Sequence, residues 1–83
     1  MVTIGEYIDP DGRSAYTRWF NRLNAPAAAK VASALVRMEQ GNFSTTKAIG
    51  EGVLECRIDF GPGYRIYFGK DGDSLVILLG GGT

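Results

Sequence analysis

The most regular alternation of apolar and polar residues runs from Glu51 to Lys70. In its first arm every second residue is apolar: Leu54, Cys56, Ile58 and Phe60. A second arm begins at Tyr64 and alternates in the same way. Side chains along a β-strand point to opposite faces with a period of two, so each arm predicts a strand that is buried on one face. The intervening Gly61-Pro62-Gly63 predicts a type II turn, in which Gly63 takes a positive φ.

The pairing register of this predicted hairpin follows from matching apolar residues with apolar residues. That criterion favours Phe60 opposite Tyr64, because a shift of one residue would mix the two faces. The polar face of the hairpin then carries two cross-strand pairs, Asp59 with Arg65 and Arg57 with Tyr67.

The first half of the chain predicts one strand and two helices. Val2 to Ile8 reads as a strand that ends at a turn of Asp, Pro and Gly. A helical spacing of apolar residues then extends from Ser14 to about Leu23, with Ser14 or Asp11 as the N-cap. A second helix is expected from about Pro26 to Gln40, and its predicted buried row is Ala28, Val31, Ala32, Leu35 and Met38.

Three segments flank the hairpin or follow it. Phe43 to Gly50 predicts an irregular strand that contains Lys47. Ser74 to Leu79 is continuously apolar after its first residue, which is typical of a strand inside a sheet and covered on both faces. The final Gly80 to Thr83 predicts a flexible run, and we expect that a longer chain was truncated there.

Without the irregular segment from Phe43 to Gly50, the predicted order is β-α-α-β-β-β, an α+β fold in which a helical hairpin packs on a mostly antiparallel sheet. With 83 residues the chain is expected to form one domain, spanning residues 1–83, near the lower size limit for a self-sufficient core. No signal peptide or membrane-spanning stretch is recognisable in the sequence, which favours a cytoplasmic location.

Composition narrows the available chemistry. Nine basic and nine acidic residues balance, which argues weakly against a dedicated nucleic-acid binder. The chain has no histidine, which excludes Ser-His and Cys-His nucleophilic schemes and histidine metal sites. Its single cysteine, Cys56, excludes an internal disulfide and is expected to be a buried structural thiol. We expect neither a cofactor nor a metal ion.

The polar face of the hairpin carries the candidate chemistry. Arg57 and Arg65 offer guanidinium donors suited to phosphate, and Tyr67 can stack on a base or donate its phenolic proton. Asp59 can orient or neutralise Arg65 and is the candidate substrate-orienting residue, and Lys47 adds a further cation. An exposed sheet face with cross-strand ion pairs explains the same pattern equally well, so the pattern alone leaves both interpretations open.

A family resemblance favours the catalytic interpretation. The motifs are WFNRL at 19–23, GNF at 41–43 with Lys47 after it, GEGVLECRIDFGPGYRIYF at 50–68 and VILLGGGT at 76–83. The chain resembles the RelE/ParE superfamily of type II toxins, and within it the HigB-like branch of addiction module killer proteins. The likeness spans essentially the whole chain, and its specific part is the block around RIDFGPGYRIYF.

This resemblance implies a ribosome-dependent mRNA endonuclease, an mRNA interferase that arrests growth until a cognate antitoxin neutralises it. Related toxins cleave RNA by attack of a ribose 2′-hydroxyl on the adjacent phosphate, and they use Lys, Arg and Tyr where other nucleases use histidine. Residue by residue, Arg57 matches the arginine expected to stabilise the phosphate, and Arg65 matches one with a supporting or substrate-orienting role. Lys47 takes the position of a base or phosphate ligand, and Tyr67 that of a stacking residue or proton donor.

Two other functions fit the same fold. One is a ParE-like inhibitor of DNA gyrase, and the other is a non-catalytic module that only binds an antitoxin. The expected partners are a cognate antitoxin, a small helix-turn-helix protein, and mRNA on the ribosome, with no membrane involved. Family members usually continue beyond the glycine run into a basic stretch and a final helix, so we expect this chain to lack a C-terminal helix that carries further site residues.

Overall fold

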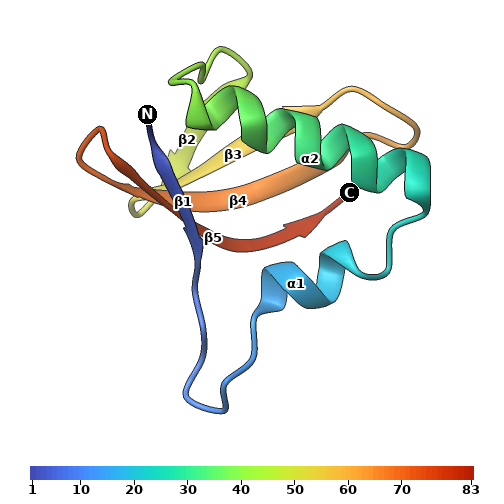
Figure 1. Ribbon diagram of the computed structural model, residues 1–83, viewed down its shortest axis with the longest axis horizontal. Coiled ribbons are helices and arrows are strands. Elements are labelled where there is room, and N and C mark those ends of the chain that lie inside the picture. The colour runs from blue at the N-terminus through green and yellow to red at the C-terminus, as the bar shows by residue number, and fades with distance from the viewer.

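The computed structural model describes residues 1–83 and contains two helices and a five-stranded sheet (Figure 1). In chain order the elements are β1 (Thr3–Glu6), α1 (Ala15–Phe20), α2 (Ala25–Glu39), β2 (Thr46–Gly50), β3 (Val53–Ile58), β4 (Tyr64–Asp71) and β5 (Leu75–Gly82). The fold is α+β, as the sequence predicts, and the segment before the hairpin forms strand β2.

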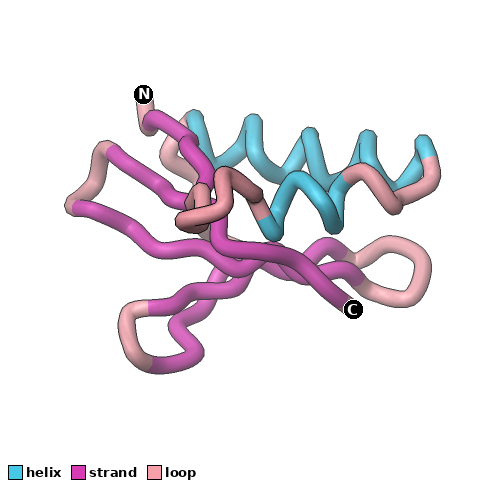
Figure 2. Tube along the Cα trace, turned by 90° about the horizontal axis from the view of Figure 1, so that it is seen from below, coloured by secondary structure: helices cyan, strands magenta, loops and turns pink.

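The strands are ordered β1-β5-β4-β3-β2, and every neighbouring pair is antiparallel except β1 with β5. Both helices lie on one side of the sheet (Figure 2). The other side, called the open face below, has no helix over it. The prediction that β5 is covered on both faces is therefore wrong: Val76 and Leu78 are buried under the helices, whereas Ile77 and Leu79 are only half-buried.

Helix α1 is short and packs mainly on β5. It begins after Ser14, whose hydroxyl oxygen accepts a hydrogen bond from the Thr17 amide at 3.0 Å, as expected for an N-cap. It ends at Phe20, earlier than predicted, and buries Tyr16 and Trp19. Burial of Tyr16, helped by the Glu6 carboxylate, raises the pKa of its hydroxyl to about 12.

Helix α2 follows a break at Asn24, whose side-chain oxygen accepts from the Ala27 amide at 2.9 Å. Its buried residues are Ala27, Val31, Ala34 and Met38, so the predicted buried row is wrong in part. Ala32 is exposed, and Ala28 and Leu35 are only half-buried. Because alanines lie on several sides of this helix, the sequence does not show which side faces the core. Packing of α2 on the twisted sheet determines that orientation.

The core lies between the helices and the sheet. Its largest fully buried side chains are Phe68, Met38, Ile66, Val31, Val76 and Cys56. Full burial of such an apolar side chain contributes roughly 1.5–3 kcal/mol. Cys56 is 1% exposed, which confirms the expected buried thiol. This core holds β3 and β4 rigidly and thereby positions the side chains that alternate onto the open face.

The hairpin of β3 and β4 differs in register from the prediction. Ile58 pairs with Tyr64, Arg57 with Arg65, and Glu55 with Tyr67, a shift of two residues. Such a shift keeps every side chain on its predicted face, so the alternating pattern could not detect it. It lengthens the loop to residues 59–63, in which the Gly63 amide donates to the Phe60 carbonyl at 3.0 Å. Gly63 has the predicted positive φ, of 85°, and Gly61 has one of 56°.

The glycine run near the C-terminus is a strand, and the prediction of a flexible run is wrong for Gly80 to Gly82. These residues pair with Tyr67, Ile66 and Arg65 of β4. A Cβ atom on Gly81 would lie 2.2 Å from the Trp19 ring, so only glycine lets α1 approach β5 this closely. The glycines are thus part of the packing of α1. Neither helix is long and apolar enough to cross a membrane.

Candidate functional site

The candidate site is the part of the open face that spans β2, β3 and β4. Its side chains project there because they occupy alternate strand positions opposite the buried ones. They are Lys47 on β2, Glu55 and Arg57 on β3, and Arg65 and Tyr67 on β4. The structure thus brings together four of the five residues predicted from the sequence, and it adds Glu55.

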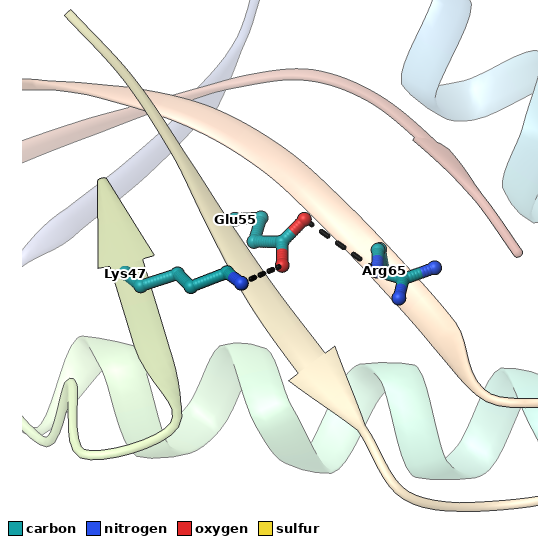
Figure 3. A network of polar contacts seen from close by, with 3 residues as sticks. All are labelled: Lys47, Glu55 and Arg65. Atoms are coloured by element: carbon teal, nitrogen blue, oxygen red, sulfur yellow. Dashed lines mark ion pairs between the residues drawn. The ribbon is translucent and has the colours of Figure 1, made fainter. Parts of the chain in front are cut away.

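Glu55 lies at the centre of this group (Figure 3). One carboxylate oxygen is 3.6 Å from Lys47 Nζ, and the other is 3.5 Å from Arg65 Nε. The side chain is only 8% exposed, whereas those of Lys47 and Arg65 are 66% and 38% exposed. A buried carboxylate needs cationic partners to offset its desolvation, so Glu55 holds both cations close to the sheet.

The central position of Glu55 could have been predicted from the sequence if the strand register had been correct. Glu55 is the charged residue opposite both Lys47 and Tyr67, because β2 and β4 flank β3. In the predicted register Arg57 took the place opposite Tyr67, and Glu55 had no partner. A correct register would have identified it as the centre of the cluster.

Arg57 and Arg65 lie directly opposite each other on β3 and β4. Arg65 is held by Glu55, but Arg57 has no carboxylate within ion-pair distance and is exposed to solvent. Two like charges in directly opposed positions are unfavourable. A bound anion would relieve that repulsion, so the pair is suited to receive one.

The predicted pairing of Asp59 with Arg65 is wrong. Asp59 follows the last residue of β3 and belongs to the loop, where it is exposed. It shares instead a surface hollow with Arg57, called the sheet hollow below. Its role in orienting substrate stays a prediction, and in this structure it would act beside Arg57.

The sheet hollow has a wholly polar lining, formed by Ser44, Thr45, Thr46, Lys47, Arg57 and Asp59. The segment before β2 is held by local hydrogen bonds: the Thr46 hydroxyl donates to the Phe43 carbonyl at 2.7 Å, and the Ser44 amide donates to the Asn42 side chain at 3.1 Å. The Arg57 amide donates to the Thr45 carbonyl at 3.1 Å, which continues the sheet to the edge of the hollow. Hydroxyls and two cations therefore surround a space open to solvent.

Tyr67 lies on the other side of Glu55 from this hollow. It is half-buried and pairs across the sheet with Glu55 and with Gly80. A Cβ atom on Gly82 would lie 3.9 Å from its ring. The glycines of β5 thus leave one side of the Tyr67 ring free of neighbouring side chains.

This arrangement is suited to binding and stabilising a phosphate. It has two cations at fixed positions, one cation free of ion pairs, and a phenol nearby. The structure contains no group of three or more His, Cys, Asp or Glu side chains that could hold a metal ion.

Comparison with known proteins found that no family model matches the chain. The chain is 41% identical over 68 residues to a protein of Haemophilus influenzae described as uncharacterized. The match covers 81% of this chain and 69% of the relative.

Proposed function

We propose that this chain, which belongs to the same family as the Haemophilus influenzae protein, is the toxin of a type II toxin–antitoxin system and cleaves mRNA on the ribosome. The observation that carries the proposal is the position of Arg57. Its guanidinium is exposed, free of ion pairs, opposite a second arginine, and beside Lys47 in a hollow lined only by polar residues. The resemblance to the RelE/ParE superfamily and its HigB-like branch supports the choice of RNA as substrate.

In this reaction the 2′-hydroxyl of a ribose attacks the adjacent phosphorus to form a 2′,3′-cyclic phosphate, and its proton passes to solvent water. The bond from phosphorus to the 5′-oxygen breaks, and that oxygen takes up a proton as it leaves. Charge builds up on the non-bridging phosphate oxygens, and cations positioned in advance lower the barrier by stabilising that charge. Arg57 and Arg65 are the residues that we assign to this role.

The ion pair with Glu55 bears on the role of Lys47. A lysine in contact with a carboxylate is suited to bind phosphate as a cation, and this favours the ligand role over that of general base. Tyr67 carries the only phenol in the cluster and is the candidate donor of the proton to the leaving 5′-oxygen. Glu55 itself has both oxygens occupied and acts as a positioning residue.

The proposal includes partners and location. A toxin of this kind acts in the cytoplasm, where mRNA and ribosomes are, and is kept inactive by a cognate antitoxin, for which a small helix-turn-helix protein is the expected type. The open face leaves the candidate site accessible to such a partner.

The test is expression of the chain in bacteria with mapping of mRNA ends. We expect growth arrest and ribosome-dependent cuts, both abolished by Arg57→Ala. The matched control is Arg22→Ala, an exposed arginine on the opposite side of the sheet, which should leave both effects intact. Growth arrest with intact mRNA and inhibited DNA supercoiling would replace the proposal with gyrase inhibition. Equal, negligible toxicity of wild type and Arg57→Ala, with antitoxin binding retained, would indicate a non-catalytic binding module.

A further inference from the structure

A second hollow, lined mostly by polar residues, adjoins the sheet hollow. It lies between α2 and the end of β3, and it is called the helix hollow below. Its wall on α2 is formed by Lys30, Ser33 and Arg37. Thr45, Arg57 and Asp59 line both hollows, so the two form one continuous groove.

The geometry of α2 explains why these side chains line the groove. Lys30, Ser33 and Arg37 are spaced i, i+3 and i+7, which places them along one side of a helix. Each precedes a buried residue of the same helix, Val31, Ala34 and Met38 respectively. Their row therefore borders the buried row on the side that faces the end of β3. Between Lys30 and Arg37 the helix rises by about 10 Å.

The groove passes the point where the sheet loses a strand. Strand β2 begins at Thr46, and the end of β3 beyond Arg57 has no neighbour on that side. This gap connects the open face with the side of the sheet that carries α2. Arg57 lies at the junction, since it lines the hollow on each side.

The charge of the groove is strongly positive although the chain is neutral overall. It contains four cationic side chains, Lys30, Arg37, Lys47 and Arg57, and a single carboxylate, Asp59. Only Lys47 among the four has an ion pair. At the far end Lys30 Nζ lies 5.5 Å from the centre of the Phe60 ring, which adds an aromatic side chain to the lining. A cationic track with hydroxyls and an aromatic side chain is typical of surfaces that bind single-stranded nucleic acid.

We infer that this groove binds the sugar–phosphate backbone of a single-stranded nucleic acid, with α2 holding phosphates next to the one at Arg57. The path of the groove around the end of β3 favours a single strand, because a duplex is stiff over the 33 Å length of this molecule. The inference rests on the proposed function only in placing the reacting phosphate beside Arg57. Binding by the α2 row can be tested without cleavage.

The experiment measures binding of a labelled 2′-O-methyl RNA of about ten nucleotides, which lacks the attacking hydroxyl, by fluorescence anisotropy over a range of salt concentrations. Lost phosphate contacts reduce the salt slope by about 0.7 each for single strands. The double variant Lys30→Ala/Arg37→Ala should therefore lower the slope by about 1.4 and weaken binding on the order of tenfold at 0.1 M salt. Arg37→Ala alone, which removes a side chain without an ion pair, should give about half of the slope change.

The matched control is Arg18→Ala/Arg22→Ala, which removes one cation from α1 and one from the segment just after it and should leave binding unchanged. Loss of affinity equal to that of the α2 double variant would overturn the inference, as would an α2 double variant that binds like wild type. Binding of duplex RNA as tight as that of the single strand would also contradict it. Single-stranded DNA of the same sequence distinguishes the source: equal affinity assigns recognition to the phosphates, and preference for RNA adds the ribose.

This outcome is separable from that of the proposed function. If oligonucleotide binding depends on the α2 residues but no mRNA is cut in cells, the groove is supported as a nucleic-acid site and the nuclease proposal is contradicted. If Lys30→Ala/Arg37→Ala changes neither the mapped mRNA cuts nor oligonucleotide binding, the nuclease proposal stands and the α2 phosphate subsite is ruled out.

Discussion

Arg57 lies directly opposite Arg65 in the β3–β4 pair, and only Arg65 has an ion pair, with Glu55. Opposed like charges destabilise a sheet, and cross-strand pairs of this kind are worth roughly 0.2–1 kcal/mol. We therefore predict that Arg57→Thr abolishes RNA cleavage. The same substitution should raise the free energy of unfolding by up to about 1 kcal/mol, because it removes the repulsion from Arg65 and because threonine is favoured in strands. Urea denaturation measures the gain, and Arg57→Lys, which keeps the charge, should show none. A less stable Arg57→Thr variant would contradict the idea that the arginine is retained at a cost in stability.

Replacing Glu55 by glutamine should release Lys47 and Arg65 from their fixed positions. Both cations are substantially exposed, so the two ion pairs contribute little to folding, and we expect a loss of no more than about 1 kcal/mol. The rate of cleavage should nevertheless fall roughly tenfold to a hundredfold, because Lys47 and Arg65 are no longer held in position to bind the phosphate. Steady-state kinetics should show the fall in kcat, with guanidinium denaturation run in parallel. Wild-type kcat in Glu55→Gln would show that Glu55 does not position the site.

Gly80 and Gly81 near the end of β5 offer a matched pair of alanine substitutions. Gly81→Ala places a Cβ atom 2.2 Å from the Trp19 ring and should destabilise the fold by about 1–3 kcal/mol, the usual range for overpacking. Gly80→Ala meets no atom within 4 Å, and it should change the unfolding free energy little. Thermal unfolding distinguishes them, because 1 kcal/mol corresponds to a Tm shift of roughly 4–8 °C in a domain of this size. Equal Tm values for the two variants would show that α1 does not pack on Gly81 in solution.

The turn between β2 and β3 predicts a stabilising substitution. Glu51 and Gly52 form its two central residues, with positive φ values of 55° and 79°. Residues other than glycine reach this region at a cost of about 1–2 kcal/mol, and asparagine tolerates it better than glutamate. Glu51→Asn should therefore raise Tm by several degrees, roughly 4–8 °C for each gain of 1 kcal/mol. Glu51→Val, which is β-branched, should lower it; a Tm order of Val above Asn would rule out this conformation.

Tyr16 predicts a loss of stability in alkali. Burial, and secondarily the Glu6 carboxylate, raise the pKa of its hydroxyl from 10.0 to about 12 in the folded state. Above pH 10 the unfolded chain ionises this tyrosine and the folded protein does not, so the free energy of unfolding falls as the pH rises from about 10 towards 12. Urea midpoints measured across this window should fall less in Tyr16→Phe, which cannot ionise. Parallel pH curves for the two proteins would contradict the raised pKa.

The sequence predicted the helices, the strands and the face on which each hairpin residue lies, because these depend on local periodicity. The helix start at Ser14 and the buried Cys56 follow from side-chain chemistry within a few residues, whereas the second helix starts at Ala25, one residue before the predicted Pro26, with Asn24 as a cap that was not predicted. The register of β3 with β4 did not follow, since a shift of two residues preserves every face, and the loop allows five residues as readily as three. Consequently Asp59 was assigned the place beside Arg65 that Glu55 holds.

The alternating pattern of the hairpin is enough to place cations and a tyrosine on one face of a small α+β domain. Which cations are paired depends on contacts between strands: β2 brings Lys47 to Glu55, and β4 brings Arg65 to the same carboxylate, while Arg57 has no ion pair. The tertiary structure also decided that the glycine run is a strand beneath Trp19, and that a row on α2 continues the groove beyond Arg57. Periodicity reports the environment of each residue along one element, whereas ion pairs, close packing and grooves arise between elements far apart in the chain.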